Sequence, residues 1–148
     1  MRNCPIDNRY WISTVCIDSY KDDVPVGWIS NPFFEAPQRF ESMMQFLKIM
    51  ECTLDLTKQP QSFTTRRCFT PSPEHVFSKT SASVERGKLA SFSLCIRFRQ
   101  NASWQGQLHW LEEGSRKNFR SALELMLLMD SALQAARRRR EGAKENSA

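Results

Sequence analysis

The stretch that decides the fold runs from Phe92 to Leu133 and reads FSLCIRFRQNASWQGQLHWLEEGSRKNFRSALELMLLMDSAL. Apolar and polar residues alternate from Ser91 to Arg99, which is typical of a strand with one buried face. Asn118 is a favourable N-cap residue, and the apolar residues after it recur at helical spacing. The predicted elements, in order, are a strand at 91–99, a loop at 100–104, a strand at 105–111, a turn at 112–115 and a helix at about 118–139.

The first half of the chain repeats this stretch at a shift of 79 positions, without a gap. The identical pairs are Cys16 and Cys95, Ile17 and Ile96, Gly27 and Gly106, Phe40 and Phe119, Ser42 and Ser121, Met50 and Met129, and Leu54 and Leu133. An internal repeat indicates that one structural unit occurs twice. We therefore predict an α+β fold with two tandem ββα repeats, which form a mainly antiparallel sheet with both helices packed on one face.

With 148 residues, the chain is long enough for one well-buried core and short for two full domains. We predict a single domain over residues 1–148. Its first strand is expected from Tyr10 to Tyr20 and its first helix from about Gln38 to Leu54. The predicted parts are repeat 1 at about 10–55, an irregular connector rich in Ser, Thr and Pro at 56–88, repeat 2 at about 89–136, and a basic tail at 137–148.

The net charge of +5 comes from the second half of the chain. Residues 1–79 carry as many acidic as basic side chains, whereas four of the later basic ones form the run Arg137–Arg140. Such a local run differs from the whole-surface positive field of many nucleic-acid-binding proteins.

The five cysteines are odd in number, and no pair has C-x-x-C spacing. Neither histidine stands near a cysteine at zinc-site spacing, so no structural metal is expected. Unpaired thiols and the lack of a signal-peptide pattern favour a reducing cytoplasm. The longest apolar run, Leu125–Met129, is far too short to span a bilayer.

Three motifs of the second half resemble a group of small uncharacterised bacterial proteins. They are the segments 98–106 (FRQNASWQG), 110–112 (WLE) and 119–125 (FRSALEL). The resemblance covers about residues 92–133 and implies a bacterial origin and a hairpin followed by a helix. It implies no activity. The first half departs from the pattern, because Asp22–Pro25 replaces Asn101–Trp104.

The loop that carries this motif is a candidate binding site. Gln100 and Asn101 offer amide groups, and Trp104 offers an aromatic anchor for a partner. In the alternative structural interpretation, Trp104 packs back on a helix and Asn101 supplies turn geometry. Gly106 has a counterpart in Gly27, which favours a structural role for it.

The sheet face away from the helices is the second candidate. Its predicted residues are Tyr20, Trp28, Arg97, Arg99, Gln107 and His109. Arginines interleaved with aromatic rings suit single-stranded RNA or DNA, because the rings stack on bases and the guanidinium groups meet phosphates. Against this, Asp18 matches Arg97 in the repeat and would neutralise it as a cross-strand pair.

Two helix features have alternative interpretations. The run Arg137, Arg138, Arg139 and Arg140 would contact phosphates, or would only complement the helix dipole in solvent. Both helices also carry a second apolar stripe at matching positions, formed by Phe46, Ile49, Leu125 and Leu128. This stripe predicts either a shared core over one sheet or a homodimer.

Signals of catalysis are weak. Cys95 and His109 are imaginable as a nucleophile and a base, but Cys95 matches Cys16 in the repeat, which has Ser30 in place of the histidine. No nucleotide-binding or serine-hydrolase motif is present. We expect no cofactor and a non-catalytic cytoplasmic binding or adaptor protein that acts on another protein. The alternatives are single-stranded nucleic-acid binding and, more weakly, a thiol-dependent enzyme.

Overall fold

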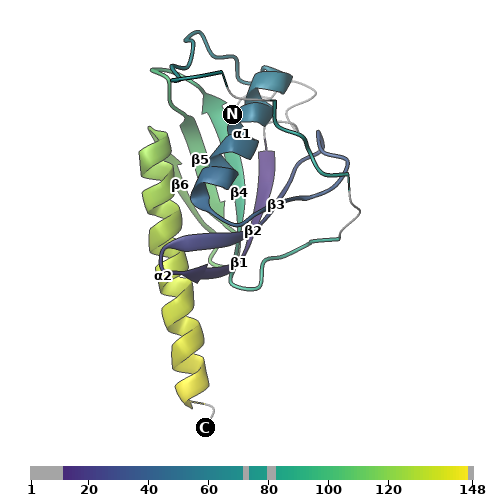
Figure 1. Ribbon diagram of the computed structural model, residues 1–148. Helices are drawn as coiled ribbons and strands as arrows, with labels where there is room; N and C mark the ends of the chain where they lie inside the picture. Colours follow the sequence, from purple (N-terminus) through teal and green to yellow (C-terminus); the bar gives the residue numbers. More distant parts are fainter. Residues whose placement is uncertain (1–11, 72–73, 80–82, 147–148) are drawn as a thin grey trace.

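The computed structural model describes residues 12–71, 74–79 and 83–146 (Figure 1). The predicted start of the first strand at Tyr10 lies outside the described residues. The elements, in chain order, are β1 (Ile12–Lys21), β2 (Val24–Ser30), β3 (Gln38–Phe40), α1 (Met43–Thr57), β4 (Ala90–Phe98), β5 (Gln105–Trp110), β6 (Ser115–Phe119) and α2 (Ala122–Asn146).

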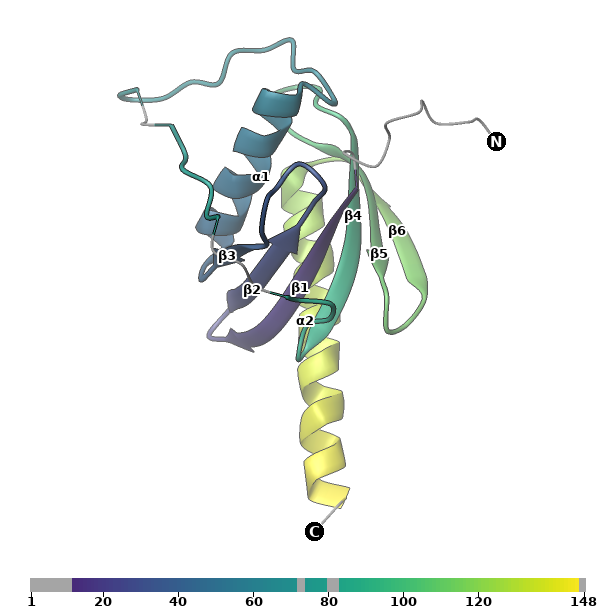
Figure 2. The same ribbon diagram turned by 90° about the vertical axis from the view of Figure 1, so that its right-hand side faces the viewer.

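The strands form one six-stranded antiparallel sheet in the order β3-β2-β1-β4-β5-β6 (Figure 2). The central strands β1 and β4 pair so that Val15 lies opposite Phe92 and Ile17 opposite Ala90. The predicted α+β class and antiparallel sheet are therefore confirmed. Because β1 and β4 run in opposite directions, Asp18 and Arg97 lie at opposite ends of this pair. The predicted cross-strand pair between them is wrong.

The hydrophobic core lies between one face of this sheet and both helices (Figure 1). Val15, Ile29, Phe92 and Leu94 point from the strands into it and are fully buried. The alternation of these residues with polar ones explains why most large apolar side chains of the central strands lie on this face. Since both helices contribute to the same core, no helix covers the opposite face of the sheet. We call this opposite face the open face.

The second apolar stripe of the helices belongs to this core. Phe46 and Leu125 are fully buried and Ile49 nearly so, while Leu128 is half-buried and packs against the core. Of the two interpretations, the structure therefore supports the shared core. Phe46, Ile49 and Leu125 are therefore not exposed for the predicted homodimer contact, because they are buried in the chain's own core.

Each half contains a third strand that the sequence patterns did not predict. The helices expected from Gln38 and Asn118 begin later, and β3 and β6 occupy the residues before them. Ser42 caps α1 by accepting a hydrogen bond from the Gln45 amide at 3.1 Å. Ser121 accepts one from the Glu124 amide at 3.1 Å. The prediction of Asn118 as an N-cap is therefore wrong.

The connector between the halves runs along the edges of the molecule. Residues 75–78 lie beside β3, and Ser62 forms an isolated bridge to Arg99. Near β4, the Gly87 amide donates to Ser91 Oγ at 2.8 Å, and the Lys88 amide donates to Asp18 Oδ1 at 3.1 Å. Residues 86–88 therefore adjoin one end of the central strand pair, next to Ser91 on the open face.

Candidate functional site

The predicted binding loop is held in place by its own side chains. Asn101 and Ala102 have positive φ angles of 56° and 55°, the left-handed geometry of a tight turn. Gln105 closes the loop: its Oε1 accepts from the Gln100 amide at 2.8 Å, and its Nε2 donates to the Gln100 carbonyl at 3.0 Å. These amide groups are thus engaged within the loop.

The same loop is attached to both helices. Trp104 is only 5% exposed, and its Nε1 donates to Glu51 Oε1 of α1 at 2.9 Å. Ser103 Oγ accepts from the Ala122 amide at the start of α2 at 2.8 Å. The prediction that Trp104 anchors a partner is wrong, because its indole is buried against the chain's own helix.

Two predicted members of the open face lie on the helix side instead. The β1–β2 register shifts between Ile17 and Ser19, and the β4–β5 register shifts between Ile96 and Phe98. Each shift adds one residue to a strand and reverses the side on which the following residues point. Tyr20 and Arg99 are therefore buried on the helix side, at 5% and 6% exposure. Their predicted place on the open face is wrong.

Both side chains bind the helix of the other half of the chain. Tyr20 donates its hydroxyl to Asp130 Oδ1 of α2 at 2.6 Å. Arg99 Nη2 lies 2.9 Å from Glu51 Oε1 and 2.6 Å from Asp55 Oδ1, both on α1. Burial of Tyr20 and its hydrogen bond to Asp130 raise the pKa of its phenol well above the ordinary value. Sequence spacing gave no signal of these contacts, because they depend on the bulges.

The cavity beside Arg99 has a volume of about 330 Å³ and is polar. Arg66 adds a second cation, with Nη1 at 2.8 Å from Glu51 Oε2. Two guanidinium groups thus meet the two carboxylates of Glu51 and Asp55, so the charges balance. This arrangement ties the connector to α1 and β4 and leaves no net charge to attract a ligand.

The open face that remains carries small side chains along its two central strands. The register places Thr14, Ser93 and His109 in one row. Trp28 lies in the next row, and the Arg39 guanidinium stacks over its ring at 5.2 Å from the centroid. The other predicted face residues are Arg97, which is exposed at a bulge, and Gln107, whose Nε2 donates to Asn118 Oδ1 at 3.3 Å.

A groove of about 510 Å³ opens on this face, between the sheet and the segment that connects β2 to β3. Ile12, Thr14 and Ser30 form its floor. Its wall is formed by residues of the segment 31–37, which includes Pro32, Phe34, Glu35 and Pro37. Ile12 is 40% exposed, and Pro32 and Glu35 are exposed as well.

Asn31 holds this wall in place. It is 8% exposed, and its Nδ2 donates to Ser13 Oγ at 3.0 Å and to the Ile12 carbonyl at 3.2 Å. Its Oδ1 accepts from the Phe33 amide at 2.8 Å, and its carbonyl accepts from the Phe34 amide at 2.9 Å. The groove is therefore formed in advance of any ligand. No sequence pattern indicates this groove, because it depends on the contacts of Asn31 with Ile12 and Ser13 of β1.

The arginine run lies inside α2 and not in a tail after it, because the helix continues to Asn146. Arg139 Nη1 pairs with Glu113 Oε2 at 2.6 Å, and its guanidinium lies over the Trp110 ring. Arg137 Nη2 lies 3.7 Å from Glu141 Oε1. Two of the four arginines are thus committed to contacts within the chain.

The structure adds little support for a thiol-dependent enzyme or a metal site. Cys95 and His109 share the open face, since they lie opposite Gln107 and Ser93. Cys16 is buried, and burial raises the pKa of its thiol. Across residues 12–71, 74–79 and 83–146, no cluster of three or more metal-binding side chains occurs. No helix in that part of the chain is long and apolar enough to cross a membrane.

No protein-family model matches the sequence, no curated protein matches it, and no solved structure matches it.

Proposed function

We propose that this chain is a non-catalytic binding protein whose groove on the open sheet face takes up a segment of another protein. The observation that carries the proposal is the preformed groove of about 510 Å³, lined by Ile12, Pro32 and Phe34. Concave, largely apolar sites with few polar groups are the usual places where ligands bind.

The lining of the groove defines the partner segment. Apolar side chains of the partner would contact Ile12, Pro32 and Pro37. Glu35, the acidic residue among the lining residues, is exposed and would favour a basic residue beside them. The hydroxyls of Thr14 and Ser30 on the floor offer hydrogen bonds to the partner's backbone.

Single-stranded nucleic-acid binding is less well supported by the geometry. Tyr20 and Arg99 would be two of its platform residues, and both are occupied by carboxylates of the helices. Trp28 already carries the Arg39 guanidinium. A base-stacking surface needs accessible rings beside free cations, and few remain on this face.

The architecture fits a duplicated βββα unit, with one strand more per repeat than the sequence pattern predicted. Support comes from features 79 positions apart: the caps Ser42 and Ser121, the positive φ angles at Asp22 and Asn101, and similar bulges in β1 and β4. In this view the first copy evolved the groove through the longer connection between β2 and β3.

Selection of peptides from a displayed random library against the purified full-length protein tests the function. Selected peptides should be apolar with a basic residue, and their binding should depend little on salt. A Thr14→Arg variant, which fills the groove floor, should weaken them at least about tenfold, as expected for a change at the centre of an interface. Gln107→Arg, on the same face but two strands away, is the matched control.

Three outcomes contradict the proposal. They are a library without binders, equal binding by the Thr14→Arg variant, and tight binding of mixed single-stranded RNA or DNA that falls steeply with salt. The last outcome would favour nucleic acid, because counterion release governs such binding.

A further inference from the structure

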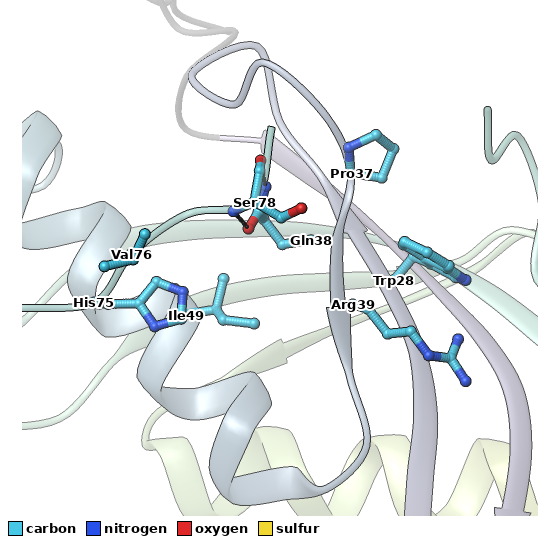
Figure 3. A pocket seen from close by; sticks show the side chains of 8 residues that line it. All are labelled: Trp28, Pro37, Gln38, Arg39, Ile49, His75, Val76 and Ser78. Carbon is cyan, nitrogen blue, oxygen red and sulfur yellow. Dashed lines mark hydrogen bonds between the residues drawn. The ribbon is translucent and has the colours of Figure 1, made fainter. Parts of the chain in front are cut away.

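The two outer edges of the sheet differ in how they are covered. At one edge, β3 has only three residues, and the segment 75–78 lies beside it. Gln38 Nε2 donates to the Ser78 carbonyl at 2.8 Å, and Gln38 Oε1 accepts from the Ser78 amide at 2.8 Å (Figure 3). The edge at β3 is thus shielded by the chain itself.

The other edge, at β6, is bare within the described part of the chain. β6 has five residues, Ser115–Phe119, and the first four are exposed. Figure 2 shows β6 as the last strand of the sheet. A strand edge of this kind presents unpaired amide and carbonyl groups that can pair with another strand.

The hydrogen-bond pattern shows which groups these are. The Leu111 amide donates to the Ser91 carbonyl at 2.9 Å, so Leu111 faces β4. Backbone groups alternate sides along a strand, so Leu108 and Trp110 of β5 face β6. Their partners Lys117 and Ser115 bond inward. It follows that the backbone groups of Arg116 and Asn118 point outward from the sheet.

The charge of this edge is positive and uncompensated. Neither Arg116 nor Lys117 forms an ion pair with a described residue, and both are exposed. Glu112 and Glu113 of the preceding turn pair elsewhere, with Arg86 at 3.3 Å and Arg139 at 2.6 Å. Arg116 lies opposite His109 and Lys117 opposite Leu108, so the two cations lie on opposite faces of the sheet.

We propose that an extended acidic segment of another protein adds to this edge as a seventh strand. The outward backbone groups of Arg116 and Asn118 would supply the main-chain pairing, and Arg116 and Lys117 would pair with acidic side chains at adjacent positions of the segment, one on each face of the sheet. A second copy of this chain is a poor occupant, because symmetric pairing of β6 strands would bring like charges opposite each other. This site is independent of the groove, which lies on β1 and β2.

The test uses decapeptides selected from a displayed library against the full-length protein. Those that bind β6 should be rich in Asp and Glu, with acidic residues at adjacent positions that face opposite sides of the sheet. Asn118→Pro removes one outward amide and leaves the inward bonds of Lys117, so it should abolish binding. Asn118→Ala keeps the amide and serves as the matched control. Reversing both charges, Arg116→Glu with Lys117→Glu, should weaken binding at least about tenfold.

Amide hydrogen exchange gives a second measurement on the same complexes. Bound peptide should slow exchange at Arg116 and Asn118, and should change Lys117 little because its amide already pairs with β5. The proposal is overturned if no acidic peptide is selected. The charges of Arg116 and Lys117 would then serve only to prevent other strands from pairing with β6. It is also overturned if the selected peptides bind the Asn118→Pro variant with the same affinity as the Asn118→Ala variant. A third contrary outcome is that the protein, at higher concentration, dimerises through β6 instead. Thr14→Arg should leave this binding unchanged, which separates it from the groove.

Discussion

At the scale of single residues, the side chains from Arg99 to Gly106 make structural contacts within the chain. Arg99 and Trp104 bind carboxylates of α1, and Ser103 accepts a bond from the start of α2. Asn101 adopts the left-handed turn, and Gln105 closes the loop. A polar loop with a tryptophan thus attaches a hairpin to two helices in this chain.

Gly106 provides the sharpest test of this structural role. A Cβ at this position would lie 2.0 Å from the Cys95 carbonyl oxygen, which belongs to the backbone and cannot rotate away. Gly106→Ala should therefore destabilise the fold by about 3 kcal/mol or more, measured by urea unfolding. Gly142→Ala is the control: it lies in α2 with open space around it, and should stabilise by about 0.5–1 kcal/mol. Equal effects of the two changes would refute the close approach.

Tyr20 predicts a dependence of stability on pH. Its folded-state pKa is raised by burial and by Asp130, while the unfolded phenol ionises near its ordinary value of about 10. The stabilisation is therefore complete below pH 10 and is lost as the pH rises further. Above pH 10 the free energy of unfolding should fall more steeply than in Tyr20→Phe, by up to about 1.4 kcal/mol per pH unit. Identical slopes in chemical denaturation would show that Tyr20 does not bind its proton more tightly when folded.

At the scale of elements, the bulge in β4 decides which arginine is structural. Arg97 and Arg99 are two positions apart, yet Arg97 is exposed and Arg99 lies among Glu51 and Asp55. Arg99→Ala should cost about 1.5–3 kcal/mol, since it removes a buried guanidinium and its charged hydrogen bonds while Arg66 still contacts both carboxylates. Arg97→Ala should change stability by less than about 0.5 kcal/mol in the same urea titration. Comparable losses in the two variants would place Arg99 at the surface.

The alternation of residues was sufficient to predict the core-facing sides of β1 and β4 and the existence of both helices. It was insufficient for β3 and β6, because these edge strands are short and Arg39, Arg116 and Lys117 interrupt the apolar pattern. It also failed after each bulge. A bulge is invisible in a pattern of period two, so Tyr20 and Arg99 were assigned to the wrong face.

The candidate binding surfaces were harder to predict than the strands. The groove depends on how Asn31 fixes the connection between β2 and β3. No local sequence pattern predicts the hydrogen bonds of Asn31 to Ser13 and Phe33. The open edge at β6 depends on which strand ends the sheet, a property of topology. Trp104 was predicted to bind a partner because it is a large aromatic residue flanked by polar residues. A tryptophan that is buried against the chain's own helix can have the same neighbours in sequence.

At the scale of the whole molecule, the two halves are tied to each other crosswise. Tyr20, from the first half, binds Asp130 on α2, and Arg99, from the second half, binds Glu51 on α1. The members of the two ties are 79 positions apart in sequence. Because helices of both halves share one core, neither half can unfold without exposing the apolar side of the other.

This arrangement predicts one cooperative unfolding transition to which the two ties contribute independently. β1 and β4 run antiparallel, so Tyr20 and Arg99 lie at opposite ends of the central strand pair and share no partner. The losses in Tyr20→Phe and Arg99→Ala should therefore add within about 0.5 kcal/mol in the double variant. For the unmodified protein, the two single variants and the double variant, each protein should give the same urea midpoint by circular dichroism as by tryptophan fluorescence. Two separated transitions would show that the halves fold independently, and a coupling well above that limit would show that one tie positions the other.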